Sequence, residues 1–110
     1  MICDLGDVVV VPFPFVDIAA EKRRPAVVMS REGFNRSNGH SICAMVTTAG
    51  RMNWPTDISI ANLEAAGLPR ACVVRFKLFT LPNSIILRRA GALSESDRNN
   101  VLGAVRGIFF

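Results

Sequence analysis

The amino-acid sequence predicts a small, mainly β domain completed by one C-terminal helix, and three observations lead to this fold class. The chain has 110 residues, of which 50% are hydrophobic and 20% are charged, so we expect one compact domain over residues 1–110. Short apolar runs alternate with turns marked by proline and glycine, which is typical of short strands. Helical periodicity is strong only near the C-terminus. Together these features predict a strongly bent barrel or sandwich of six or seven strands with a helix packed against it.

The first strand is predicted by residues 8–11, which are four consecutive valines. Such a β-branched run is typical of a buried strand. Pro12 and Pro14 then remove backbone donors, so the strand must end or follow a sheet edge there. Residues 16–24 form a polar connection. Further strands are predicted over residues 25–30, 41–47, 56–60, 71–76, 78–81 and 85–93.

One long helix is predicted at the C-terminal end. Ser94 and Asp97 have the spacing of a capping box, in which each side chain bonds the other residue's backbone N–H. Apolar residues then repeat at helical spacing: Val101, Leu102, Ala104, Val105, Ile108 and Phe109. The sequence also predicts a short helical turn over residues 62–68 and a loop with a single turn over residues 31–39.

Cysteine usage and the missing motifs narrow the class of protein. Cys3, Cys43 and Cys72 sit among apolar neighbours and form no CxxC pair, which predicts buried, reduced thiols. The N-terminus lacks the features of a secretion signal, and no apolar run is long enough for a membrane helix, so we expect a cytoplasmic protein that binds no membrane. Common nucleotide-binding, zinc-protease and hydrolase motifs do not occur, and the acidic residues do not cluster. We therefore expect no metal and no cofactor.

Basic residues are the main candidates for function. The chain has 13 Lys and Arg against 9 Asp and Glu, a net charge of +4, and eleven of the basic residues are arginine. Because the planar arginine fork binds phosphate and carboxylate in a bidentate way, a polyanionic partner is expected. Lys22, Arg23 and Arg24 lie side by side before Pro25, and the proline holds Arg24 extended. The same triplet also fits an ordinary solvated face.

Polar residues at strand ends are further candidates. Thr47 and Thr48 close the strand predicted over residues 41–47, and Arg75 and Lys77 follow the apolar pair at 73–74. Hydroxyls and cations of this kind stabilise phosphate charge, although threonine at a strand end is also common in structural roles.

The roles of five further residues stay open at this point. Arg88 and Arg89 are neighbours in a predicted strand, so alternation sends them to opposite faces and only one of them can join a basic groove. Trp54 and Phe34 lie in predicted loops, where they either stack on nucleic-acid bases or cover the core. His40 is the one side chain that titrates near neutral pH without perturbation.

Two longer motifs resemble a known family. Residues 6–15 read GDVVVVPFPF and residues 22–30 read KRRPAVVMS. They resemble the opening of MazF/PemK-like toxins, in which a strand that begins with Gly-Asp is followed by a loop and an RPxVV strand. The resemblance continues through residues 44–48, 73–75 and 78–81 and into the predicted C-terminal helix, in the same order along nearly the whole chain.

The resemblance implies an SH3-like barrel, a homodimer and a sequence-specific endoribonuclease that cleaves single-stranded RNA such as mRNA and is neutralised by a cognate acidic antitoxin. Arg24, directly before the proline, matches the family's catalytic arginine. Thr47 matches its catalytic hydroxyl, with the neighbouring Thr48 as the alternative. Arg75 matches an arginine that some members place in the active groove. Lys77 stands where some members carry an aspartate proposed as a base.

Metal-independent RNA cleavage fits these residue types. The reaction needs the ribose 2′-hydroxyl to lose its proton, the charged phosphorane to be stabilised and the 5′-oxygen to gain a proton. Arg24 is expected to hold the phosphorane and Thr47 to donate a hydrogen bond, while Glu21, which matches a loop glutamate of the family, and His40 are both open as the base. The residues expected to bind substrate are Glu21, Lys22, Arg23, Thr48, Arg75 and Lys77. The alternatives are a non-catalytic toxin that binds a protein target and a non-catalytic nucleic-acid-binding module on the same barrel.

Overall fold

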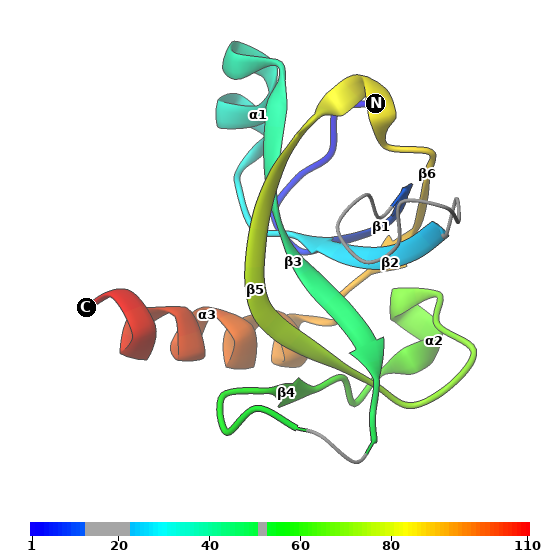
Figure 1. The fold of residues 1–110 in the computed structure, drawn as a ribbon, viewed down its shortest axis with the longest axis vertical. Helices are drawn as coiled ribbons and strands as arrows, with labels where there is room; N and C mark the ends of the chain where they lie inside the picture. The colour runs from blue at the N-terminus through cyan, green and yellow to red at the C-terminus, as the bar shows by residue number, and fades with distance from the viewer. Residues whose placement is uncertain (13–22, 51–52) are drawn as a thin grey trace.

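The computed structural model describes residues 1–12, 23–50 and 53–110, and six strands within these residues form one curled antiparallel sheet (Figure 1). In chain order the elements are β1 (Asp7–Pro12), β2 (Arg23–Val28), α1 (Glu32–Asn38), β3 (His40–Thr48), β4 (Ile58–Ser59), α2 (Leu63–Ala66), β5 (Cys72–Pro82), the 3₁₀ turn η1 (Asn83–Ile85), β6 (Arg88–Ala92) and α3 (Glu95–Phe109). The strand order is β4-β5-β3-β2-β1-β6. This curled half-barrel with a C-terminal helix confirms the predicted fold class.

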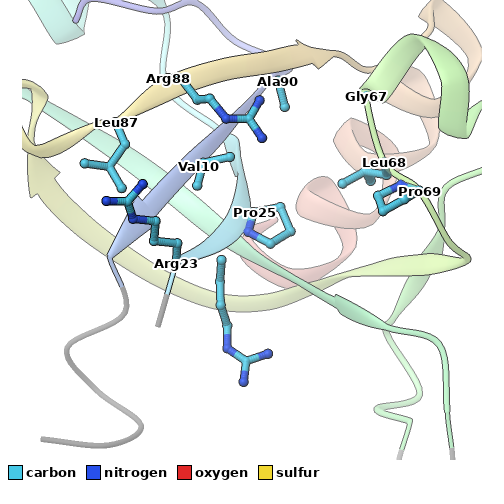
Figure 2. Close-up of a pocket in the computed structure, with 10 residues that line it drawn as sticks. Val10, Arg23, Pro25, Gly67, Leu68, Pro69, Leu87, Arg88 and Ala90 are labelled. Carbon is cyan, nitrogen blue, oxygen red and sulfur yellow. The ribbon is translucent and has the colours of Figure 1, made fainter. Parts of the chain in front are cut away.

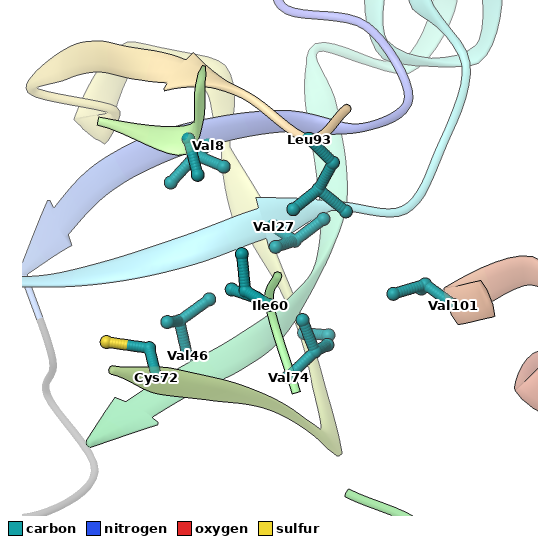
Figure 3. Packing of buried hydrophobic residues seen from close by; sticks show 10 residues of the cluster. Val8, Val27, Val46, Ile60, Cys72, Val74, Leu93 and Val101 are labelled. Atoms are coloured by element: carbon teal, nitrogen blue, oxygen red, sulfur yellow. The ribbon is translucent and has the colours of Figure 1, made fainter. Parts of the chain in front are cut away.

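Both faces of the sheet are buried over part of its area, because alternation sends the consecutive valines of β1 to opposite sides. Val8 belongs to the core on the side of α3, whereas Val9 and Val11 belong to a second core. The α3-side core contains Val8, Val27, Ala44, Val46, Ile60, Ala66, Cys72, Val74, Leu93 and Val101 (Figure 3). The second core, here the N-terminal core, contains Cys3, Val9, Val11, Ala26, Val28, Cys43, Leu81 and Ile86.

The N-terminus of α3 differs from the predicted capping box. The Ser94 hydroxyl accepts the Asp97 backbone N–H at 3.2 Å, as expected of an N-cap. The Asp97 carboxylate, however, is buried and accepts the backbone N–H groups of Ala61 at 3.0 Å and Asn62 at 2.9 Å. Asp97 therefore joins the start of α3 to the segment before α2, a tertiary contact that local spacing does not reveal.

The predicted strand boundaries need three corrections. The strands predicted over residues 71–76 and 78–81 are one strand, β5, because residues 76 and 77 are absorbed in a β-bulge opposite the step from Ala44 to Met45. The strand predicted over 85–93 begins only at Arg88, after η1. The strand predicted over 56–60 is limited to the two residues of β4.

The loop predicted over residues 31–39 contains the helix α1, which is stabilised by buried polar contacts. The Asn35 side-chain amide donates to the Cys3 carbonyl at 2.9 Å. The Asn83 amide of η1 donates to the Asn35 carbonyl at 2.8 Å, and the Ser41 hydroxyl donates to Asn83 Oδ1 at 2.6 Å. This network connects the N-terminal segment, α1, β3 and η1, which is why a helix forms where the sequence shows little helical periodicity.

The helix α2 lies so close to β6 that glycine is required on both sides of the contact. A Cβ atom on Gly67 would lie 2.2 Å from the Ala90 carbonyl oxygen, and one on Gly91 would lie 2.3 Å from the Ala65 carbonyl oxygen. Gly67 also has a φ of 70°, a left-handed conformation that closes the C-terminus of α2. The contact places the segment after α2 beside β6, where it forms one wall of a cavity.

The three cysteines are buried and free, as the sequence predicts. Desolvation by burial raises the pKa of Cys43 to about 12, which keeps this thiol protonated at neutral pH. Among the described residues, none of the helices is long and apolar enough to cross a membrane.

Candidate functional site

The basic triplet at the start of β2 lies partly outside the described residues. Glu21 and Lys22 fall in the segment 13–22, so their predicted roles stay predictions. Arg23 and Arg24 begin β2, where Arg23 pairs with Pro12 of β1 and Arg24 pairs with Val11. Neighbouring side chains of a strand leave on opposite faces, but both arginines line the same cavity.

Arg23 and Arg24 both line a cavity of about 390 Å³ at the edge of the sheet. Val10 and Pro25 lie in this cavity together with Arg88 of β6, and Leu68 and Pro69 form the opposite wall, as Figure 2 shows. The prediction for the arginine pair of β6 is confirmed: Arg88 lines the cavity, whereas Arg89 points away and its Nε lies 3.0 Å from Asp7 Oδ1. Within the described residues neither Arg23 nor Arg88 forms an ion pair.

Arg24 and Thr47 lie on the other face of the sheet, in adjacent strands. The pairing of β2 with β3 runs from Val28 and Cys43 to Ala26 and Met45. Arg24 and Thr47 each lie two residues beyond this last pair, so alternation sends their side chains to the same face of the sheet. Thr47 is half-buried and Thr48 is exposed, and alternation sends the two side chains to opposite faces.

The Arg24 guanidinium has an unusual environment. Its Nε is buried, yet no atom of the described residues accepts a hydrogen bond from it. Buried polar groups in proteins are nearly always hydrogen-bonded, because an unmet donor costs about 1–3 kcal/mol. A guanidinium with an unmet donor can bind an anionic oxygen, and its planar fork matches both carboxylate and phosphate.

Arg75 is bound within the protein on the same face. It pairs with Met45 across β3 and β5, so it is the diagonal neighbour of Thr47. Its Nε and Nη2 donate to the two Asp57 carboxylate oxygens at 3.1 and 2.8 Å, and its guanidinium lies 5.4 Å from the ring centroid of Trp54. The hydrogen bonds from Arg75 lower the pKa of Asp57 below its usual value.

The remaining candidate residues divide between this face and distant positions. Lys77 is exposed in the bulge of β5, next to Arg75 in the strand. His40 begins β3, and its Nδ1 lies 2.9 Å from the Asn38 carbonyl oxygen. Seven residues of extended strand, about 23 Å, separate His40 from Thr47. Within one copy of the chain, His40 therefore lies at the opposite end of β3 from Thr47.

In the described part of the chain, no three His, Cys, Asp or Glu side chains are grouped closely enough to hold a metal ion. The described side chains on or beside this part of the sheet include the arginine guanidinium groups, the Thr47 hydroxyl, the Asp57 carboxylate, the Lys77 amine and the indole of Trp54.

Comparison with known families decides the identity. One protein-family model matches residues 4–109, and it describes the PemK-like, MazF-like toxin of type II toxin–antitoxin systems. The chain belongs to this family. This PemK/MazF-like protein is thus a toxin of a type II toxin–antitoxin system, as its two long motifs indicate. No curated protein sequence matches it.

Solved structures of MazF proteins share the fold of this PemK/MazF-like toxin. MazF from Deinococcus radiodurans is 22% identical, with a TM-score of 0.76 and coverage of 98% of this chain and 96% of that chain. The MazE–MazF complex (Form-III) from the same organism is 19% identical, with a TM-score of 0.78 and coverage of 98% and 96%. An endoribonuclease in complex with its cognate antitoxin, from Mycobacterial species, is 17% identical, with a TM-score of 0.77 and coverage of 96% and 92%.

Sequence reasoning missed one residue of this site in the PemK/MazF-like toxin. Asp57 binds both the guanidinium of Arg75 and the backbone N–H of Trp54, but it lies 18 residues from Arg75 in the sequence. A local turn joins Trp54 to Asp57, and the pairing of β4 with β5 brings Arg75 to this turn.

Proposed function

We propose that this toxin is an endoribonuclease that cleaves single-stranded RNA at the face carrying Arg24 and Thr47. Membership of the PemK/MazF family supports the proposal, and one solved structural neighbour is itself named an endoribonuclease. The observation that carries it is the buried Arg24 Nε, which has no acceptor within the described residues and lies one strand from the Thr47 hydroxyl.

The proposed reaction uses a nucleophile that the substrate supplies. The ribose 2′-oxygen attacks the adjacent phosphorus, the bond from phosphorus to the 5′-oxygen breaks, and the products are a 2′,3′-cyclic phosphate and a 5′-hydroxyl end. Arg24 stabilises the extra negative charge of the phosphorane with two parallel N–H donors. Thr47 donates a further hydrogen bond to a non-bridging oxygen.

The base that takes the 2′-proton is assigned here from residue type and position in the sequence. His40 begins β3, at the opposite end of that strand from Thr47, and Lys77 lacks the carboxylate of the aspartate in whose place it stands. Glu21 is the acidic residue nearest to Arg24 in the sequence, and we assign it the role of base. In this scheme the protonated Glu21 returns its proton to the 5′-oxygen as that oxygen leaves.

Substrate binding extends over both faces at the start of β2. We assign Arg23, with Lys22 before it, to phosphates that flank the scissile one, because the cavity is lined by Arg23, Arg24 and Arg88, none of which forms an ion pair within the described residues. Thr48 and Lys77 border the Arg24 face from β3 and β5, where each can contact the RNA backbone.

The proposal includes two protein partners. The end of α3 exposes Ile108, Phe109 and Phe110, and such apolar surface favours association with a second copy of the chain, so we propose a homodimer.

We also propose a cognate acidic antitoxin that covers the arginine surfaces. The solved neighbours include a MazE–MazF complex and an endoribonuclease bound to its cognate antitoxin. Binding driven by arginines weakens as salt rises.

The test is cleavage of four matched nucleic acids by the purified toxin. Long RNA of mixed sequence is labelled and offered as a single strand and as a duplex, with DNA of the same sequence in both forms, in buffer containing EDTA. We expect discrete fragments from single-stranded RNA alone. Binding without cleavage of any strand would favour the nucleic-acid-binding module, and growth arrest in cells without RNA binding or cleavage would favour a toxin that acts on a protein.

A further inference from the structure

Trp54 is held in place by a cluster that spans two segments of the chain. Its backbone N–H donates to Asp57 Oδ2 at 2.9 Å, and the same carboxylate receives both hydrogen bonds from Arg75. The Arg75 guanidinium in turn lies over the indole, 5.4 Å from the ring centroid. The ring is thus fixed through both its backbone and one of its faces.

This rigidity contrasts with the exposure of the ring. Trp54 is 44% exposed, although burying a large aromatic side chain would contribute several kcal/mol to folding. The ion pair beneath it is well shielded, with side-chain exposures of 17% for Arg75 and 5% for Asp57. The guanidinium occupies one face of the indole, so the exposed area belongs to the other face and the edges. A rigid ring with one open face is suited to stacking on a second flat group.

The Trp54 ring and the residues that hold it lie near Thr47, one of the two proposed catalytic residues. Arg75 is the diagonal neighbour of Thr47 on the same face of the sheet, and such neighbours lie about 7–8 Å apart. A nucleotide that follows or precedes the scissile phosphate at Arg24 would bring its base within this range. A flat, π-rich base is also the part of an RNA strand that the arginines do not bind.

We propose that Trp54 is a nucleobase-stacking subsite for a nucleotide next to the cleaved bond, and that Arg75 and Asp57 are positioning residues that hold the indole for it. The inference rests on the proposed ribonuclease function and adds to it. It gives Arg75 an indirect role in substrate binding, because its guanidinium is engaged by Asp57 and by the ring. Stacking tolerates every base, so Trp54 supplies affinity, and sequence discrimination comes from other contacts.

The chain offers an intrinsic probe for this subsite, since Trp54 is its single tryptophan and it contains no tyrosine. We would titrate the wild-type toxin with a single-stranded oligonucleotide pool in which every ribose is 2′-deoxy or 2′-O-methyl, so that no cleavage occurs. Trp54 fluorescence reports stacking, and the anisotropy of a dye on the oligonucleotide reports binding independently. The expected result is quenching of Trp54 that saturates together with the anisotropy.

Variants separate stacking from general binding. Trp54→Ala is expected to weaken oligonucleotide binding by about 5- to 150-fold, the range measured for loss of one stacked base, and Trp54→Phe should recover most of the affinity. Asp57→Asn should weaken binding less and make the Trp54 emission more depolarised, because the ring loses its support. The matched control is Phe34→Ala: Phe34 is also 44% exposed but lies on α1, at the opposite end of the molecule (Figure 1), and should bind normally.

The outcomes distinguish this inference from the function on which it rests. If the oligonucleotide binds by anisotropy while Trp54 stays unquenched and Trp54→Ala binds as well as wild type, the subsite is wrong although the ribonuclease stands. If Trp54→Ala weakens only an antitoxin peptide, the ring belongs to a protein interface and the proposal is overturned. If wild type neither binds nor cleaves any RNA, the proposed function fails first and the subsite fails with it.

Discussion

Replacing Arg24 by alanine is the change that separates catalysis from stability most clearly. In the described residues Arg24 Nε has no hydrogen-bond acceptor, so its removal leaves no buried partner unsatisfied. We therefore expect the free energy of unfolding of Arg24→Ala to change by less than about 1 kcal/mol, mainly through lost packing of the alkyl stem. Thermal denaturation followed by circular dichroism measures this change.

The effect on the reaction is expected to be far larger. Removing one preorganised donor to a charged transition state costs about 2.7–4 kcal/mol, which corresponds to about 10²–10³ in kcat. Arg24→Lys keeps the charge but loses the planar fork, and its kcat should lie between those of wild type and Arg24→Ala. Single-turnover cleavage of a labelled RNA measures the rate without interference from product release.

Arg23→Ala is the matched control, because it removes the same charge from the adjacent residue, which lines the same cavity but whose side chain leaves the strand on the opposite face. A single exposed contact contributes up to about 1 kcal/mol, so this variant should lose fivefold or less. Equal losses in the two variants would mean that net charge alone matters. An Arg24→Ala protein that is folded and nearly as active as wild type would refute the catalytic assignment.

The remaining predictions concern the hydroxyl, the fold and its dependence on pH. Thr47→Val should slow cleavage by about 10- to 100-fold, the scale of one hydrogen bond to a charged group, and Thr47→Ser should restore most of the rate in the same assay. Asp97→Ala should lower the free energy of unfolding by about 2–4 kcal/mol, because two backbone N–H groups lose a buried acceptor, and urea denaturation measures this change. Asn99→Ala, an exposed change on the same helix, should have little effect. The pKa values of Asp4 and Asp57 are lowered in the folded state, by backbone N–H groups and by Arg75 respectively, from an ordinary value of 3.8. A carboxyl group with a lowered pKa stabilises the fold at any pH above its pKa in the unfolded state. The melting temperature should therefore be steady above about pH 5 and fall as the pH drops below about 4. Asp57→Asn should make that fall smaller.

The sequence predicts those parts of the fold in which local chemistry and tertiary packing agree. The valine run at residues 8–11 predicts a buried strand, and β1 has buried valines on both of its faces. Ser94 marks the start of α3, and alternation separates Arg88 from Arg89. Each of these features depends on neighbours within a few residues, so its signal is visible without the fold.

Other features depend on contacts between distant segments and therefore have no local signal. The helix α1 is supported by Asn35, whose partners are Cys3 and Asn83, and the β5 bulge is set by the opposite strand. At the site, residues 24 and 47 are matched by family resemblance, and the register of β2 with β3 explains why they share a face. The ion pair between Asp57 and Arg75 forms only when β4 pairs with β5.

The chemical nature of the RNA ends produced by the toxin tests the central claim most directly. The purified protein is incubated with single-stranded RNA in EDTA, and the fragments are analysed by mass spectrometry at short times. The account predicts 2′,3′-cyclic phosphate at one new end and 5′-hydroxyl at the other, because the 2′-oxygen is the nucleophile that Arg24 and Thr47 serve. Fragments with 5′-phosphate and 3′-hydroxyl ends would mean that water attacks the phosphorus, and they would contradict both the mechanism and the roles assigned to Arg24 and Thr47.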